Sequence, residues 1–162
     1  HDDSHHLIYL YVGSVAMIKI NILAVGNLKE KFWTEAVSEY EKRISRYARF
    51  KITELPEKRT KEEEGKEILR KITGYPVAMD IAGKEVSSTE FADFFNKKLT
   101  DGISEFSLII GGSDGLSDEV KSACKERISF GRVTFPHQLM RVILSEQVYR
   151  ALTIMNNVTY HK

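Results

Sequence analysis

The chain has 162 residues, of which 42% are hydrophobic and 29% charged, so one globular domain with a sizeable core is expected. The formal net charge of +1 excludes a nucleic-acid surface spread over the whole chain, and any such surface must be local. A single cysteine, Cys124, excludes an intrachain disulfide, and only His137 and His161 among the histidines lie beyond residue 6, so no metal site is expected. This cysteine usage favours a cytoplasmic protein.

Residues 1–16 differ in composition from the rest of the chain. They hold three of the five histidines and an apolar run of about ten residues, well short of the roughly 20 that cross a bilayer. No Lys or Arg precedes that run, as a signal peptide would require. We interpret the segment as a leader or extended start before Met17, and expect no membrane association. An extra strand is the alternative, because residues 7–12 are rich in strand formers.

From Met17 onwards, short apolar runs alternate with helical spacing. Strands are predicted at 18–25, 49–55, 75–81, 106–112 and 128–135. Helices are predicted over 30–47, 61–72 and 87–99, and from Ser117 and Pro136. The apolar face of the first helix is expected to comprise Phe32, Ala36, Tyr40 and Ile44.

This alternation predicts a single α/β domain over residues 17–162, with a mainly parallel sheet and helices on both faces. In such sheets ligands bind beyond the carboxyl ends of the strands. The segments to consider are therefore those that follow Ile81 and Ile110, and residues 130–135.

Two glycine-containing segments lie at these strand ends. The segment 108–117 matches neither the dinucleotide fingerprint nor the P-loop, so alone it predicts a tight turn. In the segment 129–138 a strand turns directly into a proline-started helix, with Gly131 inside it. Either the chain bends there and exposes backbone groups, or it is a buried strand with a bulge.

The last helix combines apolar and polar faces. Its core positions are expected to be Met140, Leu144, Val148, Leu152 and Met155. His137 and Arg141 share another face, and Glu146 can pair with Arg150 four residues on. The common interpretation is a solvated side, but Glu146 lies partway towards the apolar face, where an unpaired charge is costly.

Two further segments carry groups that suit a phosphate backbone. Residues 42–51 hold five Lys or Arg and no acid, which fits either an RNA contact or a solvated helix end. Tyr160 and His161 close the chain, where residues are usually frayed but can fold over a substrate or a neighbouring subunit.

Several of these segments together resemble one family. "MIKINILAVGNLKEKFW", "IIGGSDGL", "SFGRVTFPHQLMRVILSEQVYRA" and "YHK" occur in the order and spacing of the RlmH family, bacterial 23S rRNA methyltransferases of the SPOUT superfamily. The similarity runs from Met17 to Lys162, and the combination is highly specific although no single motif is.

The resemblance implies an α/β fold with a C-terminal trefoil knot, a homodimer, and S-adenosylmethionine bound in the knot. It implies methyl transfer to N3 of a pseudouridine in 23S rRNA on the assembled ribosome. Carried over by position, the cofactor-binding residues are Met79, Gly111, Phe130, Gly131, Arg132, Val133, Thr134 and Phe135. Met79 stands where the family commonly has leucine, a volume-conserving exchange.

Catalysis requires removal of the pseudouridine N3 proton, and the candidates for this base are His137, Glu146 and His161. Arg141 and Arg150 suit the holding of phosphates or carbonyls, because arginine stays protonated and offers a planar fork of donors. The residues expected to contact RNA are Arg150, Tyr160, Lys42, Arg43 and Arg46. A SPOUT enzyme acting on another RNA such as tRNA, and a non-catalytic ribosome-binding factor, are the alternatives.

Overall fold

The computed structural model describes residues 17–160, so the interpretation of residues 1–16 and the prediction for His161 lie outside the described residues. The strands are β1 (Lys19–Val25), β2 (Arg49–Leu55), β3 (Tyr75–Glu85), β4 (Glu105–Ile110) and β5 (Glu126–Ser129). The helices are α2 (Lys31–Ile44), α3 (Lys61–Lys71), α4 (Ser88–Thr100), α5 (Asp118–Ala123) and α6 (His137–Met155). Each predicted element is therefore present, with shifted ends.

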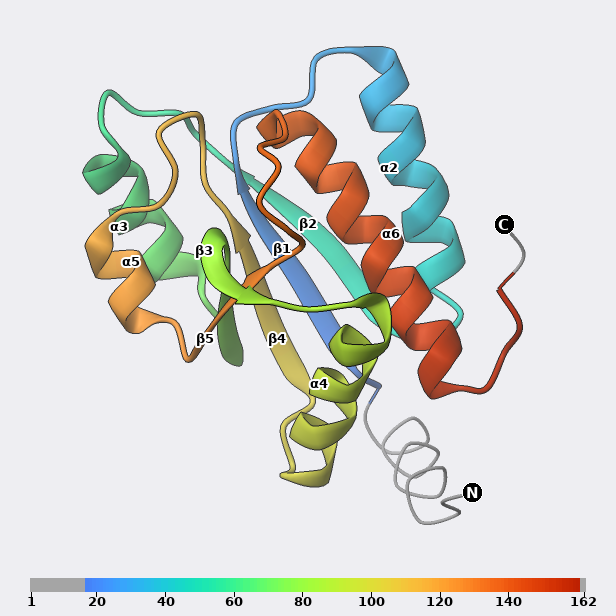
Figure 1. Ribbon diagram of the computed structural model, residues 1–162. Coiled ribbons are helices and arrows are strands. Elements are labelled where there is room, and N and C mark those ends of the chain that lie inside the picture. The colour runs from blue at the N-terminus through green and yellow to red at the C-terminus, as the bar shows by residue number, and fades with distance from the viewer. Residues whose placement is uncertain (1–16, 161–162) are drawn as a thin grey trace.

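The strands form one sheet in the order β2-β1-β4-β3-β5, and every neighbouring pair is parallel (Figure 1). Six of the seven residues of β1 are buried, as expected of a central strand covered on both sides. Because side chains alternate along a strand, Ile20 and Ile22 enter one core cluster, whereas Leu23 and Val25 enter the other.

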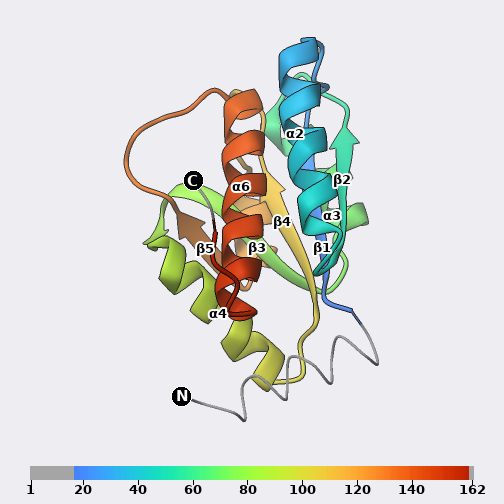
Figure 2. The ribbon, with the colours of Figure 1, turned by 90° about the vertical axis from the view of Figure 1, so that its right-hand side faces the viewer.

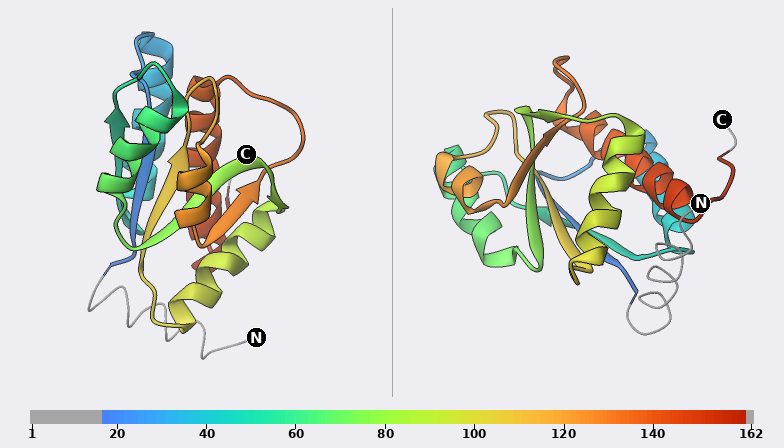
Figure 3. Two further views of the ribbon diagram at one scale, coloured as in Figure 1. Left: turned by 90° about the vertical axis from the view of Figure 1, so that its left-hand side faces the viewer. Right: turned by 60° about the horizontal axis from the view of Figure 1, so that its bottom comes forward.

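Helices cover both faces of the sheet, which confirms the predicted fold class. Helices α2, α4 and α6 lie over one face, and α3 and α5 over the other (Figures 1 and 3). The larger cluster contains Phe91 and Phe95 of α4 and Leu144 of α6, and the smaller contains Ile68 of α3 and Val120 of α5. Helix α6 packs between α2 and α4, so this long helix is held along both sides.

The predicted helix starts agree with the caps. Ser87 and Glu90 form the capping box of α4, and the Ser117 side chain accepts a hydrogen bond from the backbone N–H of Val120 at the start of α5. The predicted apolar face of α2 is wrong at its first position, because Phe32 is 61% exposed. Its ring contacts that of Trp33 (centroids 4.9 Å apart), and burial in α2 is confined to Val37 and Ile44.

The fifth strand is shorter than predicted. It ends at Ser129, and residues 130–136 leave the sheet and arch towards the start of α6 (Figure 2). The Ser129 hydroxyl accepts a hydrogen bond from the backbone N–H of Gly131 (3.1 Å) and donates one to its carbonyl (2.8 Å). Gly131 has a φ of +121°, which ends extended pairing. We refer to residues 130–136 as the arched loop.

The third strand continues beyond the predicted end at Ile81, to Glu85. Its pairing with β5 shifts register between Met79 and Lys84, so residues 80–83 form a bulge. Gly83 is required in this bulge, because a Cβ there would lie 2.6 Å from the carbonyl carbon of Arg127. Beyond the bulge β3 pairs with β5 alone, with Lys84 and Glu85 beside Ile128 and Ser129.

Strand order does not report how the chain is threaded, so the trefoil knot stays a prediction. Within residues 17–160, no helix combines the length and the apolar character needed to cross a membrane.

Candidate active site

A cavity of about 720 Å³ lies beside the bulge of β3, at the carboxyl ends of β4 and β5. Three segments line it: residues 79–81 at the bulge of β3, the turn after β4, and the region from Ile128 through the arched loop into the first turn of α6. This is the place that the strand ends predicted for a ligand crevice.

In the turn after β4, residues 111–115, the backbone of the first residues lies very close to the backbone of Gly115. We call this turn the glycine loop. The N–H of Gly115 donates to the carbonyl of Gly112 (3.0 Å), which closes the turn. A Cβ on Gly111 would lie 2.6 Å from the carbonyl carbon and oxygen of Gly115. Since real Cβ atoms do not approach so closely, glycine is required at residue 111 for the loop to fold back beside the cavity.

The remaining walls are largely apolar side chains. Met79 and Ile81 come from β3, Phe130 and Phe135 from the arched loop, and Met140 from α6. Met140 was predicted as a core residue, but it is only partly buried and lines the cavity as well as contacting the core. A cavity of apolar walls with exposed main chain at two loops suits an organic ligand bound mainly by shape and backbone hydrogen bonds.

Of the predicted cofactor-binding residues, all but Arg132 line this cavity. Arg132 is exposed on the arched loop. Whether these residues bind a cofactor stays a prediction. Sequence reasoning missed further lining residues, among them Asp80, Ile81, Ser113 and Gln138. Ser113 directly follows a predicted strand and Gln138 a predicted helix start, which was the available signal, whereas Asp80 and Ile81 fall inside the predicted strand 75–81.

His137 is the one candidate base within residues 17–160 that the structure places at the cavity. It is the first residue of α6. Its Nδ1 atom is buried and has no hydrogen-bond partner within the described part of the chain. The Cε1 atom, which is bonded to this nitrogen, lies close to the turn after β1, since a Cβ on Gly26 would be 3.4 Å from it. The ring therefore sits between the cavity and the β1–α2 turn.

Arg141 lies one turn further along α6 and does not line the cavity. Its side chain is 1% exposed. The guanidinium donates to Glu54 Oε2 (2.6 Å) and to the carbonyl of Gly26 (3.1 Å), and that same carboxylate oxygen accepts from the N–H of Leu28 (3.0 Å). Burial lowers the pKa of Arg141, and the Glu54 carboxylate opposes that shift. This contact network joins α6 to the ends of β1 and β2, and a direct catalytic role for Arg141 stays a prediction.

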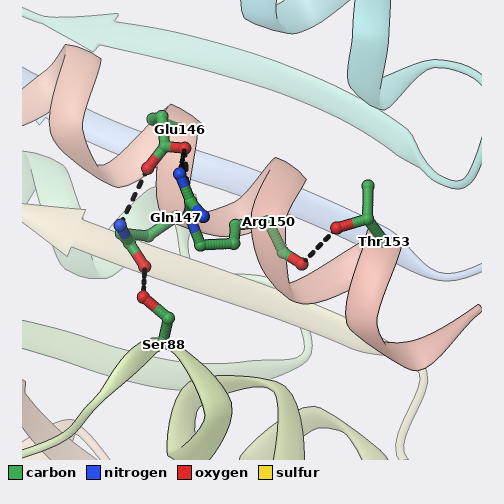
Figure 4. Close-up of polar contacts among 5 residues, drawn as sticks. All are labelled: Ser88, Glu146, Gln147, Arg150 and Thr153. Atoms are coloured by element: carbon green, nitrogen blue, oxygen red, sulfur yellow. Dashed lines mark hydrogen bonds and ion pairs between the residues drawn. The ribbon is translucent and has the colours of Figure 1, made fainter. Parts of the chain in front are cut away.

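Glu146 and Arg150 form the ion pair expected from their spacing, at 2.8 Å between Arg150 Nη2 and Glu146 Oε2 (Figure 4). Neither lines the cavity. Glu146 is nine residues beyond His137, or about 13–14 Å along the helix axis. The Arg150 guanidinium lies 4.2 Å from the ring centroid of Tyr160. The structure thus brings Glu146, Arg150 and Tyr160 together, away from His137.

The basic residues of α2 lie near the same region. Lys42, Arg43 and Arg46 are exposed at the end of that helix. Arg43 pairs with Glu39 (2.8 Å), and its guanidinium lies 5.4 Å from the ring centroid of Tyr40 and 5.8 Å from that of Tyr149. Because Tyr149 also contacts Tyr160, Arg43 of α2 meets Arg150 and Tyr160 in one group of aromatic and basic side chains.

Comparison with known proteins identifies the family. A model described as "Predicted SPOUT methyltransferase" matches residues 18–161. A relative from Limosilactobacillus reuteri (strain DSM 20016), named ribosomal RNA large subunit methyltransferase H, is 46% identical over 159 residues, covering 90% of this chain and 100% of the relative. The chain belongs to the RlmH family of SPOUT methyltransferases. The family resemblance drawn from the motifs is thereby confirmed.

Solved structures of other methyltransferases share the fold at low identity. A probable methylase family protein from Haemophilus influenzae Rd KW20 aligns with a TM-score of 0.56 at 11% identity, covering 90% of this chain and 72% of the other. A probable methyltransferase from Bordetella pertussis Tohama I aligns with a TM-score of 0.51 at 10% identity, covering 93% and 99%. The chain therefore has the same fold as these proteins, although only 10–11% of the aligned residues are identical.

Proposed function

We propose that this RlmH chain transfers the methyl group of S-adenosylmethionine to N3 of a pseudouridine in 23S rRNA, acting as a homodimer on the assembled ribosome in the cytoplasm. The observation that carries the proposal is the cavity beside the bulge of β3 and the ends of β4 and β5, in a chain 46% identical to a ribosomal RNA large subunit methyltransferase H.

The residues present fit the cofactor. The cavity is formed by main chain at Gly111 and in the arched loop, and by the apolar side chains of Met79, Phe130 and Phe135. Such a lining can receive an adenine ring on apolar contacts and hold polar groups on backbone N–H and C=O. The cofactor supplies a methyl group already activated by its sulfonium, so the task left to these residues is to fix the line of attack.

The remaining chemical task is removal of the N3 proton, and the geometry favours His137 for it. His137 lines the cavity with an unpartnered Nδ1. The Glu146 carboxylate, in contrast, accepts three hydrogen bonds from neighbouring side chains. In our proposal His137 accepts the proton while the arched loop excludes water from the reacting atoms.

Substrate recognition in this proposal uses the other end of α6. Arg150 and Tyr160, with Arg43 nearby on α2, offer charged and aromatic groups for a phosphate and an unpaired base. A chain of net charge +1 has little general attraction for free RNA, which is why two subunits and the ribosome together are expected to define the target.

The dimer is proposed from the outer side of α6. Ile154 there is 38% exposed, Val158 just beyond it is 43% exposed, and Leu139, Val142 and Ile143 are half-buried. An apolar stripe of this kind on a surface helix is typical of a protein interface. Sedimentation equilibrium is expected to give twice the mass of one chain at micromolar concentration, and a single-chain mass would contradict this part of the proposal.

A methyl-transfer assay with mass analysis of nucleosides tests the function. Assembled ribosomes carrying the pseudouridine are expected to yield N3-methylpseudouridine, whereas ribosomes with uridine at that place are not. Equal methylation of free 23S rRNA would contradict the need for the ribosome. Methylation of tRNA alone would show that tRNA is the substrate instead of 23S rRNA. Failure to bind S-adenosylmethionine would favour the alternative of a non-catalytic ribosome-binding factor.

The choice of base is tested by comparing His137→Gln with His161→Gln. If His137 is the base, kcat of the first variant falls by roughly 10²–10⁴-fold with cofactor affinity little changed. Gln138→Ala is the matched control, because Gln138 also lines the cavity but has no titratable group. A loss confined to His161→Gln would transfer the role to the C-terminal tail.

A further inference from the structure

Both oxygens of the Glu146 carboxylate on α6 accept hydrogen bonds within the protein. Its Oε1 accepts from Gln147 Nε2 (2.8 Å), and its Oε2 accepts from both Nε (3.1 Å) and Nη2 (2.8 Å) of Arg150 (Figure 4). The side chain is 18% exposed, so these charge-assisted bonds are only partly open to water. A carboxylate held in this way is poorly placed to collect a substrate proton.

The same carboxylate is linked to α4 through its neighbour. The Gln147 amide oxygen accepts a hydrogen bond from the Ser88 hydroxyl (2.6 Å). Ser88 is the first residue of α4 and lies within the capping box, directly after its N-cap residue Ser87. The start of α4 is thus fixed to the middle of α6 by side chains alone, with Glu146 orienting the amide that makes the contact (Figure 4).

The chain after α6 returns to the same place. Asn157 has a φ of +56°, and the N–H of Val158 donates to the carbonyl of Thr153 (2.9 Å), which is the pattern of a Schellman C-cap. The side chain of Asn156 donates to the carbonyl of Leu152 (2.7 Å) and secures the last turn. This cap reverses the chain and places Tyr160 against a residue ten positions earlier.

Tyr160 then packs on side chains of α6. Its ring lies edge-on to Tyr149 (centroids 5.1 Å apart) and under the Arg150 guanidinium at 4.2 Å. Burial raises the pKa of Tyr160 to about 12, and the interaction of its hydroxyl with the Glu146 carboxylate adds to the shift. We call Ser88, Glu146, Gln147, Arg150 and Tyr160 the Glu146 cluster.

We propose that Glu146 is a positioning residue, which fixes the Arg150 guanidinium and, through it, the returning C-terminal segment at Tyr160 for contact with RNA. The inference deepens the proposed function and rests on it, since Arg150 and Tyr160 are the RNA contacts assigned there. It assigns to Glu146 no part in proton transfer.

The test is Glu146→Gln, which keeps the shape but removes the charge that orients Arg150. Loss of one charge-assisted hydrogen bond is expected to raise KM for ribosomes about tenfold. The value of kcat at saturating ribosomes, the pH profile of kcat and the affinity for S-adenosylhomocysteine stay as in the wild type. Hydrogen exchange of the Val158 and Tyr160 amides becomes faster. Glu119→Gln, an exposed acid on α5, is the control for loss of one negative charge.

A fall of kcat by a factor of 100 or more with loss of one limb of the pH profile would overturn the inference and make Glu146 the base. Unchanged KM and unchanged amide exchange would also overturn it. Glu146→Asp, which keeps the charge, is expected to recover most of the ribosome affinity, and its failure to do so would contradict an electrostatic role. Failure of the proposed function is separate, since the wild-type protein would then not methylate ribosomes.

Discussion

The two ends of α6 are built on opposite principles. Its first turn borders a cavity whose walls are largely main chain and apolar side chains, with His137 as the only titratable side chain of that turn in contact with it. Its later turns carry the Glu146 cluster, in which charged and aromatic side chains hold one another. A cofactor with an already activated methyl group requires a binding pocket of complementary shape, whereas an RNA target requires oriented charged and aromatic side chains.

The contrast predicts different sensitivities. At the cavity, the addition of a single methyl group to a glycine is expected to be harmful, while changes of exposed charge nearby are not. In the Glu146 cluster, the loss of charge is expected to be harmful, while charge-conserving changes are tolerated. The variants below test this difference, from the largest expected effect to the smallest.

Gly111→Ala is expected to have the largest effect on cofactor binding. The new Cβ would lie 2.6 Å from the Gly115 backbone, so the glycine loop must move. Overpacking of this kind costs about 1–3 kcal/mol, or roughly 5- to 150-fold in affinity for S-adenosylhomocysteine measured by calorimetry.

Gly102→Ala is the control for this variant. Its Cβ would meet nothing within 4 Å, and Gly102 lies outside the cavity lining, so the affinity is expected to be unchanged even if its φ of +86° lowers the melting temperature. Equal affinity in Gly111→Ala and the wild type would contradict the closeness of the glycine loop to the ligand.

Arg141→Met is expected to lower stability more than activity. The methionine keeps the apolar stem but leaves the Gly26 carbonyl and Glu54 without the guanidinium. Because Glu54 is 39% exposed and can be rehydrated, the loss is expected at about 1.5–3 kcal/mol in the free energy of unfolding measured in urea. Arg132→Met, on the exposed arched loop, is expected to be neutral. Unchanged stability in Arg141→Met would show that the network contributes nothing net.

Gly131→Ala tests the effect of backbone conformation without a steric clash. A Cβ there would meet nothing within 4 Å, but the φ of +121° disfavours any L side chain, at a cost of about 1–2 kcal/mol. The arched loop is expected to relax and cofactor affinity to fall about tenfold. Arg132→Ala beside it is expected to leave affinity unchanged, as its side chain does not line the cavity. The opposite order of effects would assign the cofactor contact to the arginine.

The smallest effect concerns the pH dependence of the Glu146 cluster. The pKa of Tyr160 is raised to about 12, above the ordinary value for tyrosine, so the folded tail binds this proton more tightly than an unfolded tail does. The stabilisation is therefore complete below about pH 10 and is lost as the pH rises towards 12. Faster amide exchange of residues 158–160 above pH 10, absent in Tyr160→Phe, would confirm this. If the wild type and Tyr160→Phe show the same amide exchange above pH 10, the Tyr160 side chain is solvent-exposed and the prediction is contradicted.

The part of the site that is main chain could be predicted from sequence. Parallel strands end at a common edge, so the cavity was located from the segments that follow Ile81 and Ile110 and from residues 130–135. The length of the fifth strand could not be predicted from sequence. Residues 130–135 alternate like a strand, and only the turn formed by Ser129 and Gly131 ends β5.

The side-chain part was only half predictable. The spacing of Glu146 and Arg150 reveals their pair, since both lie on one helix. It does not reveal that Ser88 comes from another helix or that Tyr160 returns after a C-cap. Arg141 was expected to hold a substrate group, but its partners Glu54 and Gly26 belong to distant strands that only the tertiary fold brings to it.

A crystal structure of the protein soaked with S-adenosylhomocysteine tests most directly the central claim that the cofactor binds in this cavity. The account predicts density for the whole ligand inside the 720 Å³ cavity, with its sulfur facing the side from which His137 is reached and backbone contacts at Gly111 and the arched loop. Ligand bound at any other place on the chain, or a cavity that stays empty at saturating concentration, would contradict it.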